Sequence, residues 1–345
     1  MRDVTSRSLG HPTRALHCLA GLFFGLALVF AIVAWTLGDV FFFRLGTEAL
    51  IFAGLALSVD LLLGHTGLLP LGQALFFGMG AYVSALVLKN WSSSFWIATG
   101  VALVFSALAG LIGGLIAIRS KGVYFALISF GLAQVVSKVI FNTRELGASD
   151  GMIGVPVAQI APGLESGQPA GFFLVVLSCL FVCYAALAYL METPFGRQLG
   201  AVRTNEQRLS FLGFDPWRTK LAAFIGAACI AGLSGALYPM LRGFVSPELM
   251  FFQVSGNAVI NVIVGGTGTL IGPLYGSALL TVLRSVVGSF TAHHQIVIGV
   301  LFIVIVIVLP RGLIGLAAPA LQQRLARRRG DAAGPALSVP AEHRQ

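Results

Sequence analysis

Apolar segments about as long as a bilayer-spanning helix recur along almost the whole chain. A helix needs about 20 mostly apolar residues to cross the hydrocarbon core of a membrane. Candidate crossings in the 345-residue chain are 18–37, 48–63, 67–88, 95–118, 122–141, 171–191, 218–242, 256–268, 270–289 and 295–314. Because only helices and closed barrels can satisfy their backbone groups in lipid, this recurrence favours a helical membrane protein.

The content of charged residues agrees with this interpretation. Hydrophobic residues make up 57% of the chain, charged residues only 10%, and the mean hydropathy is +0.90. An ordinary soluble domain carries about 25% charged residues. The chain therefore lacks the polar surface that a soluble enzyme, a nucleic-acid-binding protein or a disordered scaffold needs. We predict an all-α fold, a polytopic transmembrane helical bundle with about 8–10 spans.

The basic residues indicate an orientation, because Lys and Arg accumulate in short cytoplasmic loops. The net charge is +9, and a cytoplasmic N-terminus places sixteen of the 22 Lys and Arg residues inside: Arg2, Arg7, Arg14, Arg119, Lys121, Arg197, Arg203, Arg208, Arg218, Lys220, Arg311, Arg324, Arg327, Arg328, Arg329 and Arg344. This predicts a cytoplasmic N-terminal segment 1–17, a transmembrane domain 18–316, an external loop 142–170, a cytoplasmic loop 192–217 and a disordered cytoplasmic tail 317–345.

Two parts of this map leave alternatives open. Residues 256–289 contain no charged break, only the glycine-rich run 265–268 and Gly272-Pro273. They can form two short crossings, or one long segment and a re-entrant piece enclosed by protein. The first apolar stretch follows Arg7 and Arg14, as a signal peptide would, but no convincing cleavage site follows it. We therefore expect a retained helix.

The sequence contains no motif for covalent chemistry. The glycine-rich run GGTGTLIG has no lysine to reach a phosphate, so it is not a phosphate-binding loop. Four cysteines lie within apolar stretches, and no histidine or carboxylate joins them at metal-ligand spacing. We therefore expect no metal site and no enzyme activity. Energy for active transport would come from a partner or from an ion gradient.

The loop 192–217 predicts a short helix between two crossings. Thr204 and Gln207 have the spacing of a capping box, and Gly213 suits the left-handed position that ends a helix. The helix between them would have about eight residues, with Leu209 and Leu212 on one apolar edge. It can be an ordinary surface connector, or it can dock into another protein.

Polar residues inside the apolar segments are the candidates for function. Asp60 lies near the cytoplasmic end of a span, where a carboxyl group is a functional candidate or a contact between helices. Amide side chains recur on one helix face at Gln253, Asn257 and Asn261, with Gly265 continuing the series. This stripe either joins helices or lines a solute pathway. Gln73 is a further pathway candidate, although packing is the simpler interpretation.

Several phrases, in order from about residue 50 to 316, resemble the permease subunits of branched-chain amino-acid ABC importers of the LivM type: GLLPLGQALFFGMGAYVSALV, KGVYFALISFGLAQVV, GASDGMIGVP, TPFGRQLGAVRTNEQRLSFLGFDPWRTKLAAFIGAACIAGLSGALYP, GTGTLIGPLYGSALL and LPRGLIGL. The resemblance implies a multi-pass permease of the bacterial inner (plasma) membrane. It also implies a second permease subunit, two cytoplasmic ATPase subunits that bind the ATP, and a periplasmic solute-binding protein. This chain would then need no cofactor of its own.

In that family the loop matching 197–213 is the segment that contacts the ATPase. The candidate coupling residues are therefore Arg203, Thr204, Glu206, Gln207, Leu209, Leu212 and Gly213. The sequence departs from the family pattern at Pro70, where Ser is common, and at Asp60, where Asn is frequent. We expect these departures, and the polar face of 253–261, to affect which solute the protein carries rather than how it folds.

The function expected from the resemblance is ATP-driven import of branched-chain or related small amino acids. One alternative is an ABC permease for urea, short amides or aromatic acids. A proton-coupled secondary transporter of a small carboxylate-bearing solute, with Asp60 as the proton carrier, is an alternative from another class. A membrane protein without a pathway is the third.

Overall fold

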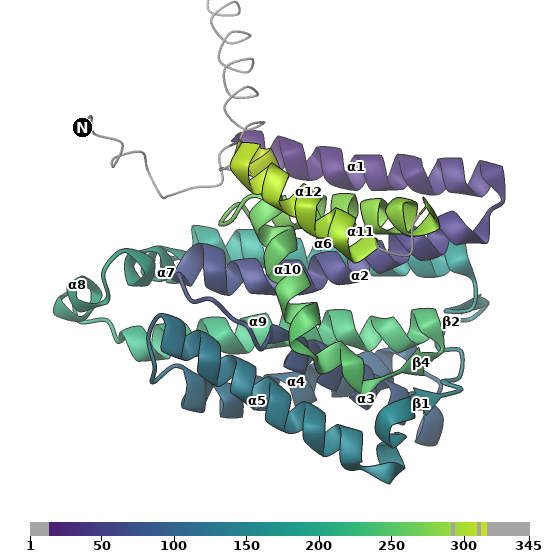
Figure 1. Cartoon of the computed structure of the whole chain (residues 1–345), viewed down its shortest axis with the longest axis horizontal. Coiled ribbons are helices and arrows are strands. Elements are labelled where there is room, and N and C mark those ends of the chain that lie inside the picture. Colours follow the sequence, from purple (N-terminus) through teal and green to yellow (C-terminus); the bar gives the residue numbers. More distant parts are fainter. Residues whose placement is uncertain (1–13, 291–293, 309–311, 316–345) are drawn as a thin grey trace, which may run out of the picture.

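A computed structural model describes residues 14–290, 294–308 and 312–315 of the chain (Figure 1). The predicted tail 317–345 and most of the predicted N-terminal segment 1–17 lie outside these residues.

Helices make up most of the described chain, which confirms the all-α polytopic fold. The longer ones are α1 (Arg14–Leu37), α2 (Val40–Asp60), α3 (Gln73–Asn90), α4 (Phe95–Ala117), α5 (Val123–Asn142), α6 (Pro169–Glu192), α9 (Pro216–Arg242), α11 (Gly272–Phe290) and α12 (His294–Val308). Three are shorter: α7 (Pro194–Thr204), α8 (Glu206–Phe211) and α10 (Phe252–Gly265). Each expected crossing therefore overlaps one helix.

Six helical segments among the described residues are long and apolar enough to cross a membrane: Leu16–Thr36, Val40–Thr66, Phe95–Ala117, Val123–Asn142, Pro169–Glu192 and Pro216–Arg242. Helix α10 has 14 residues, or about 21 Å, which is shorter than the roughly 30 Å hydrocarbon core. It runs obliquely across the long helices (Figure 1). The region 256–289 therefore contains two helices, α10 and α11, with an irregular break between them, and α10 is too short to cross the hydrocarbon core by itself.

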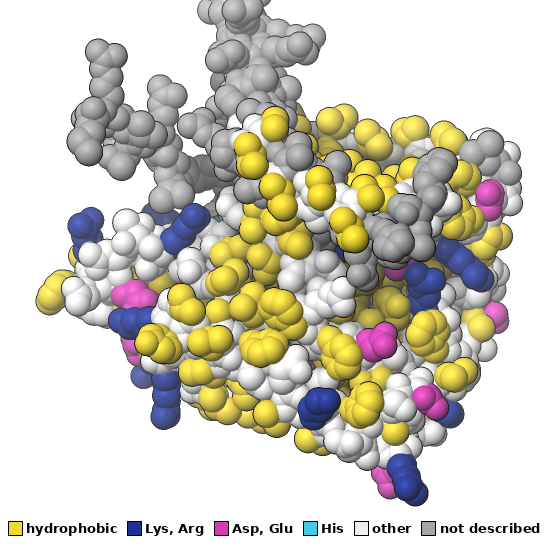
Figure 2. Space-filling model, in the orientation of Figure 1, with side chains coloured by type: hydrophobic (Ala, Val, Ile, Leu, Met, Phe, Trp, Pro, Cys, Tyr) yellow, Lys and Arg dark blue, Asp and Glu magenta, His cyan; other side chains and the backbone are white. Residues whose placement is uncertain are grey.

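The surface has an apolar belt between two charged ends. In the view of Figure 2, Lys, Arg, Asp and Glu side chains gather mainly over α7 and α8 at one end and over the loops at the opposite end, with hydrophobic side chains between them. This is the distribution of a protein whose middle lies in lipid. We call the two ends the α8 end and the loop end. The predicted cytoplasmic loop 192–217 and external loop 142–170 lie at these opposite ends (Figure 1).

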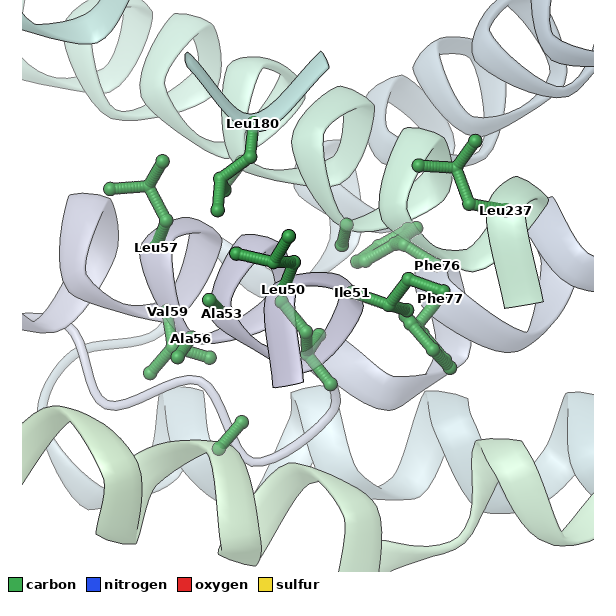
Figure 3. Close-up of a cluster of buried hydrophobic side chains, with 14 of the residues drawn as sticks. Leu50, Ile51, Ala53, Ala56, Leu57, Val59, Phe76, Phe77, Leu180 and Leu237 are labelled. Atoms are coloured by element: carbon green, nitrogen blue, oxygen red, sulfur yellow. The ribbon is translucent and has the colours of Figure 1, made fainter. Parts of the chain in front are cut away.

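Helix α9 lies at the centre of the bundle, because α3 and α4 both pack along it. Small residues allow this close approach. A Cβ added to Gly80 of α3 would collide with the carbonyl oxygen of Gly232, and one added to Gly235 would collide with that of Phe77. Beside this crossing, side chains of α2, α3, α6 and α9 form a buried apolar cluster, with Ile51, Leu180 and Leu237 among them (Figure 3).

The loop end contains small β pairs that the sequence did not predict. Strand β1 (Met152–Ile153) pairs antiparallel with β4 (Phe244–Val245), and β2 (Gln159–Ala161) pairs with β3 (Leu164–Glu165). Short 3₁₀ turns, η2 (Arg144–Leu146), η3 (Ala148–Asp150) and η4 (Pro247–Met250), flank them. The β1–β4 pair joins the loop after α5 to the segment after α9. Strands of two or three residues are too short to show an alternating pattern in the sequence.

Candidate functional site

The Asp60 carboxylate holds the break between α10 and α11. Asp60 is the last residue of α2 and is completely buried. Its Oδ1 accepts a hydrogen bond from the backbone N–H of Gly268 at 2.6 Å, and its Oδ2 accepts one from the N–H of Leu270 at 3.0 Å. Both donors would otherwise lack partners in this irregular segment, and unpaired backbone groups inside a protein are costly. We call this arrangement the Asp60 latch.

The latch stabilises a strained backbone. Leu270 has φ +58° and Gly268 has φ +76°, both in the left-handed region. For a residue with a side chain, this region costs about 1–2 kcal/mol. Leu270 is buried, and its hydrogen bond to Asp60 offsets the cost of the left-handed backbone conformation. The sequence prediction singled out Asp60 correctly as a costly polar residue, but it could not identify the two backbone groups that Asp60 binds.

Arg203 connects the latch to the α8 end. After Asp60 the chain continues as a π-helix, η1 (Leu61–Thr66), a conformation that often marks functional sites. Arg203 lies near the end of α7, and its Nη1 donates a hydrogen bond to the carbonyl oxygen of Gly64 within η1. A Cβ added to Gly64 would collide with both the Asp60 carboxylate and Gly268. The guanidinium of Arg203 therefore lies directly beside the latch.

The predicted start of the short helix is wrong by one residue. Thr204 is the last residue of α7, and its hydroxyl donates to the carbonyl oxygen of Gly200 at 2.9 Å. Asn205 is the N-cap of α8 instead, and its Oδ1 accepts from the N–H of Arg208 at 3.1 Å. The capping box with Gln207 does not form, because the Thr204 hydroxyl bonds within the preceding helix. Helix α8 has six residues rather than about eight.

The predicted end of α8 is correct. Gly213 has φ +84°, and its N–H donates to the carbonyl oxygen of Ser210. The N–H of Phe214 donates to the carbonyl oxygen of Leu209, which completes a Schellman motif. Only glycine reaches this left-handed geometry without steric cost.

The apolar residues of α8 divide between two environments. Leu209 is 3% exposed and anchors the helix, whereas Leu212 is 69% exposed. The predicted common edge of Leu209 and Leu212 is therefore only partly correct. Phe211, which the sequence analysis missed, is 90% exposed at the α8 end. Leu209 and Leu212 also line a cleft of about 370 Å³ between α6, α7 and α8, together with Arg197 and Arg208.

Glu206 ties α8 to the bundle. Its carboxylate forms an ion pair with Lys220 of α9 and a second one with Lys121, in the α4–α5 connection, at 3.0 Å. Burial raises the pKa of Glu206, but the hydrogen bonds and charges of the two lysines lower it further, so the pKa lies below its ordinary value of 4.5. Glu206 therefore positions α8 against its own chain. Gln207 is exposed on the same helix.

The amide stripe of α10 runs from an exposed position to a buried one. Gln253 is exposed, Asn257 is half-buried and Asn261 is 7% exposed. Gln73, the first residue of α3, is 1% exposed, and neither atom of its amide has a hydrogen-bond partner among the described residues. Burying the Gln73 amide without a hydrogen-bond partner costs free energy. Among the described residues, no cluster of three or more His, Cys, Asp or Glu side chains is arranged to hold a metal.

A protein-family model matches residues 41–306, more than half of the chain, and this model describes the permease component of the branched-chain amino acid transport system. The chain belongs to this family. It is therefore a multi-pass permease of the bacterial inner membrane and a component of ABC transport systems. The sequence resemblance to LivM-type permeases is confirmed.

Several curated relatives of the permease carry informative names. It is 29% identical over 338 residues to a protein of Salmonella typhimurium and to one of Escherichia coli, each named a high-affinity branched-chain amino acid transport system permease protein LivM. Each alignment covers 90% of this chain and 79% of the relative. An autoinducer 2 import system permease, LsrC of Yersinia pestis, is 26% identical over 66% of this chain and 62% of its own length. No solved structure matches the permease.

The ion pairs of Glu206 predict a pH dependence. Because the folded state lowers its pKa, the ionised carboxylate stabilises the permease fully above pH 4.5 and loses this effect as the pH falls further. We expect Glu206→Gln to lower stability by about 1 kcal/mol at pH 7. Thermal unfolding of the two proteins across pH should show this gap closing below pH 4.5. Glu145→Gln, which changes an exposed carboxylate at the loop end, is the control. A stability difference between Glu206→Gln and the wild type that is the same at pH 7 and below pH 4.5 would contradict the ion pairs assigned to Glu206.

Proposed function

We propose that the permease imports branched-chain or related small amino acids, driven by ATP that two partner ATPase subunits hydrolyse. It would pair with a second permease subunit and receive its solute from a periplasmic binding protein. Family membership supports the transport role. The similarity to two LivM permeases supports the solute class.

The observation that carries the ATP-driven part of the proposal is the exposed apolar tip of α8. Phe211 and Leu212 extend from the α8 end beyond the bundle, on a helix capped at both ends and tied down by Glu206. A large aromatic side chain that is 90% exposed on such a rigid support is typical of a protein-binding surface. The ATPase partner is the occupant that we propose.

The mechanism follows from the connection between α8 and the latch. Closure of the ATPase subunits around ATP would push α8, and α7 would move with it. Arg203 would then pull on Gly64 in η1, beside the two hydrogen bonds from Asp60 to the α10–α11 break. A shift of this break would tilt α10 and α11 and change which side of the membrane the pathway faces.

The amide stripe of α10 and the amide of Gln73 are the groups that we propose for the pathway. Neutral amides supply both donors and acceptors to a zwitterionic solute, yet bind it weakly enough to release it. Gln253 and Asn257 remain accessible in the single chain, where a second permease would complete the pathway.

Two alternatives remain to be tested. A proton-coupled transporter would need Asp60 to exchange protons with both sides, but its two oxygens already accept backbone hydrogen bonds within a buried latch. The latch therefore favours a structural role. Within the ABC class, the similarity to an autoinducer 2 import permease keeps other solutes under consideration, including urea, short amides and aromatic acids.

Phe211→Asp tests the docking of α8. We expect this change to reduce co-purification of the ATPase subunits and to abolish ATP-driven uptake into proteoliposomes, because a charge replaces the apolar contact. Membrane insertion should be unaffected, since Phe211 lies outside the spans. Ile153→Asp makes the same kind of change at an exposed apolar site of the loop end and should keep the ATPase bound.

Normal assembly and uptake with Phe211→Asp would reject α8 as the docking element. Uptake that follows a pH gradient without ATP would instead support the secondary transporter.

Asn257→Leu together with Asn261→Leu tests the pathway. If these amides contact the solute, the doubly substituted complex should assemble and hydrolyse ATP, but its uptake should fall about tenfold or more or change its solute preference. If the amides only join helices, at about 0.6 kcal/mol each, stability should fall while uptake per assembled complex stays constant. Uptake assays and thermal unfolding on the same preparations distinguish these outcomes.

A further inference from the structure

A second pocket lies at the loop end, at the opposite end of the bundle from the α8 segment. It has a volume of about 230 Å³ and is enclosed by the start of α2, the loop after β1, the first turn of α6 and the last turn of α9. We call it the arginine pocket, because Arg44 and Arg242 both line it. Its volume is below that of a typical drug-sized site, so it suits a small solute.

The polar side of the arginine pocket favours an anion. Arg242 is held in place by Glu48, with its Nη2 at 2.7 Å from the carboxylate Oε2. Arg44 is exposed and forms no ion pair with any described residue. Glu48 offsets the charge of Arg242, so Arg44 adds a positive charge to the pocket, and the planar fork of an arginine matches a carboxylate. Ser166 accepts a hydrogen bond from the N–H of Ala158 at 2.9 Å, which leaves its hydroxyl proton for another acceptor.

Apolar side chains also line the arginine pocket. Val155, Phe172 and Met240 line it and are buried, and Val157 lines its more exposed edge. A pocket lined by both guanidinium groups and apolar side chains has the chemistry to bind a small carboxylate that carries a short hydrocarbon group. An amino acid with an aliphatic side chain is such a molecule.

We propose that the arginine pocket receives the carboxylate of a small aliphatic amino acid, or of a related monocarboxylate, before the solute enters the pathway. The assignment of this end as the entry side rests on the proposed import function and on the predicted external position of 142–170. The binding itself does not depend on ATP. The site and the import function can therefore be tested separately.

The test measures protection of a cysteine in the pocket. Val157→Cys is introduced after replacement of the four native cysteines, and the complete complex is placed in nanodiscs of neutral phosphatidylcholine. The rate of maleimide labelling is measured with leucine, with 4-methylpentanoate, which lacks the amino group, and with 3-methylbutylamine, which lacks the carboxylate. We expect leucine and 4-methylpentanoate to slow labelling severalfold, and the amine to have no effect.

Arg44 supplies the matched variants. Arg44→Gln should raise the leucine concentration that gives half-maximal protection from labelling at least tenfold. Arg44→Lys should give an intermediate concentration, because lysine keeps the charge but lacks the planar fork of the guanidinium. Arg144→Gln, which removes an exposed arginine of the same end outside the pocket, should have no effect.

The possible results separate the site from the transport function. Equal protection by the amine, protection that survives Arg44→Gln, or ATP-driven leucine uptake without any protection would overturn the arginine pocket. Protection without ATP-driven uptake would support the pocket and count against the proposed import function.

Discussion

The buried carboxylate of Asp60 is the interaction on which this structure depends. It joins the end of α2 to a break that lies more than 200 positions further along the chain, and it supplies acceptors to two backbone N–H groups. The break in turn allows α10 to stop short of a full crossing and α11 to begin in a new direction. Without these hydrogen bonds, the left-handed Leu270 would have no compensation for its strain.

In the proposed mechanism, the latch would receive the movement of the ATPase partners. Arg203 of α7 donates a hydrogen bond to Gly64 beside the latch, while Glu206 keeps α8 fixed to α9 and to the α4–α5 connection. Force applied to the exposed tip of α8 would therefore reach the break through a few rigid contacts rather than through a flexible loop. At the other end, the arginine pocket offers the solute a first contact.

Much of the fold follows from local sequence signals, because a run of about 20 apolar residues is sufficient to predict a membrane helix. The left-handed end of α8 at Gly213 was also predictable from a local signal, because glycine commonly takes the left-handed position that ends a helix. The start of α8 was not, because Thr204 and Asn205 are both good caps and only the preceding helix decides between them. Asp60 was recognisable as a costly residue, but its partners Gly268 and Leu270 are distant in sequence. Phe211 was overlooked, although an aromatic residue in a charged loop was a usable signal.

Hydrogen–deuterium exchange of residues 265–271 in the assembled complex tests the coupling through the latch most directly. When a non-hydrolysable ATP analogue binds the ATPase partners, the rates of backbone amide exchange at Gly268 and Leu270 of the wild-type permease should differ from the rates without nucleotide. Arg203→Gln should abolish this response, whereas Arg119→Gln, an exposed arginine at the same end, should preserve it. A break that does not respond to nucleotide, or a response that persists without Arg203, would contradict the account.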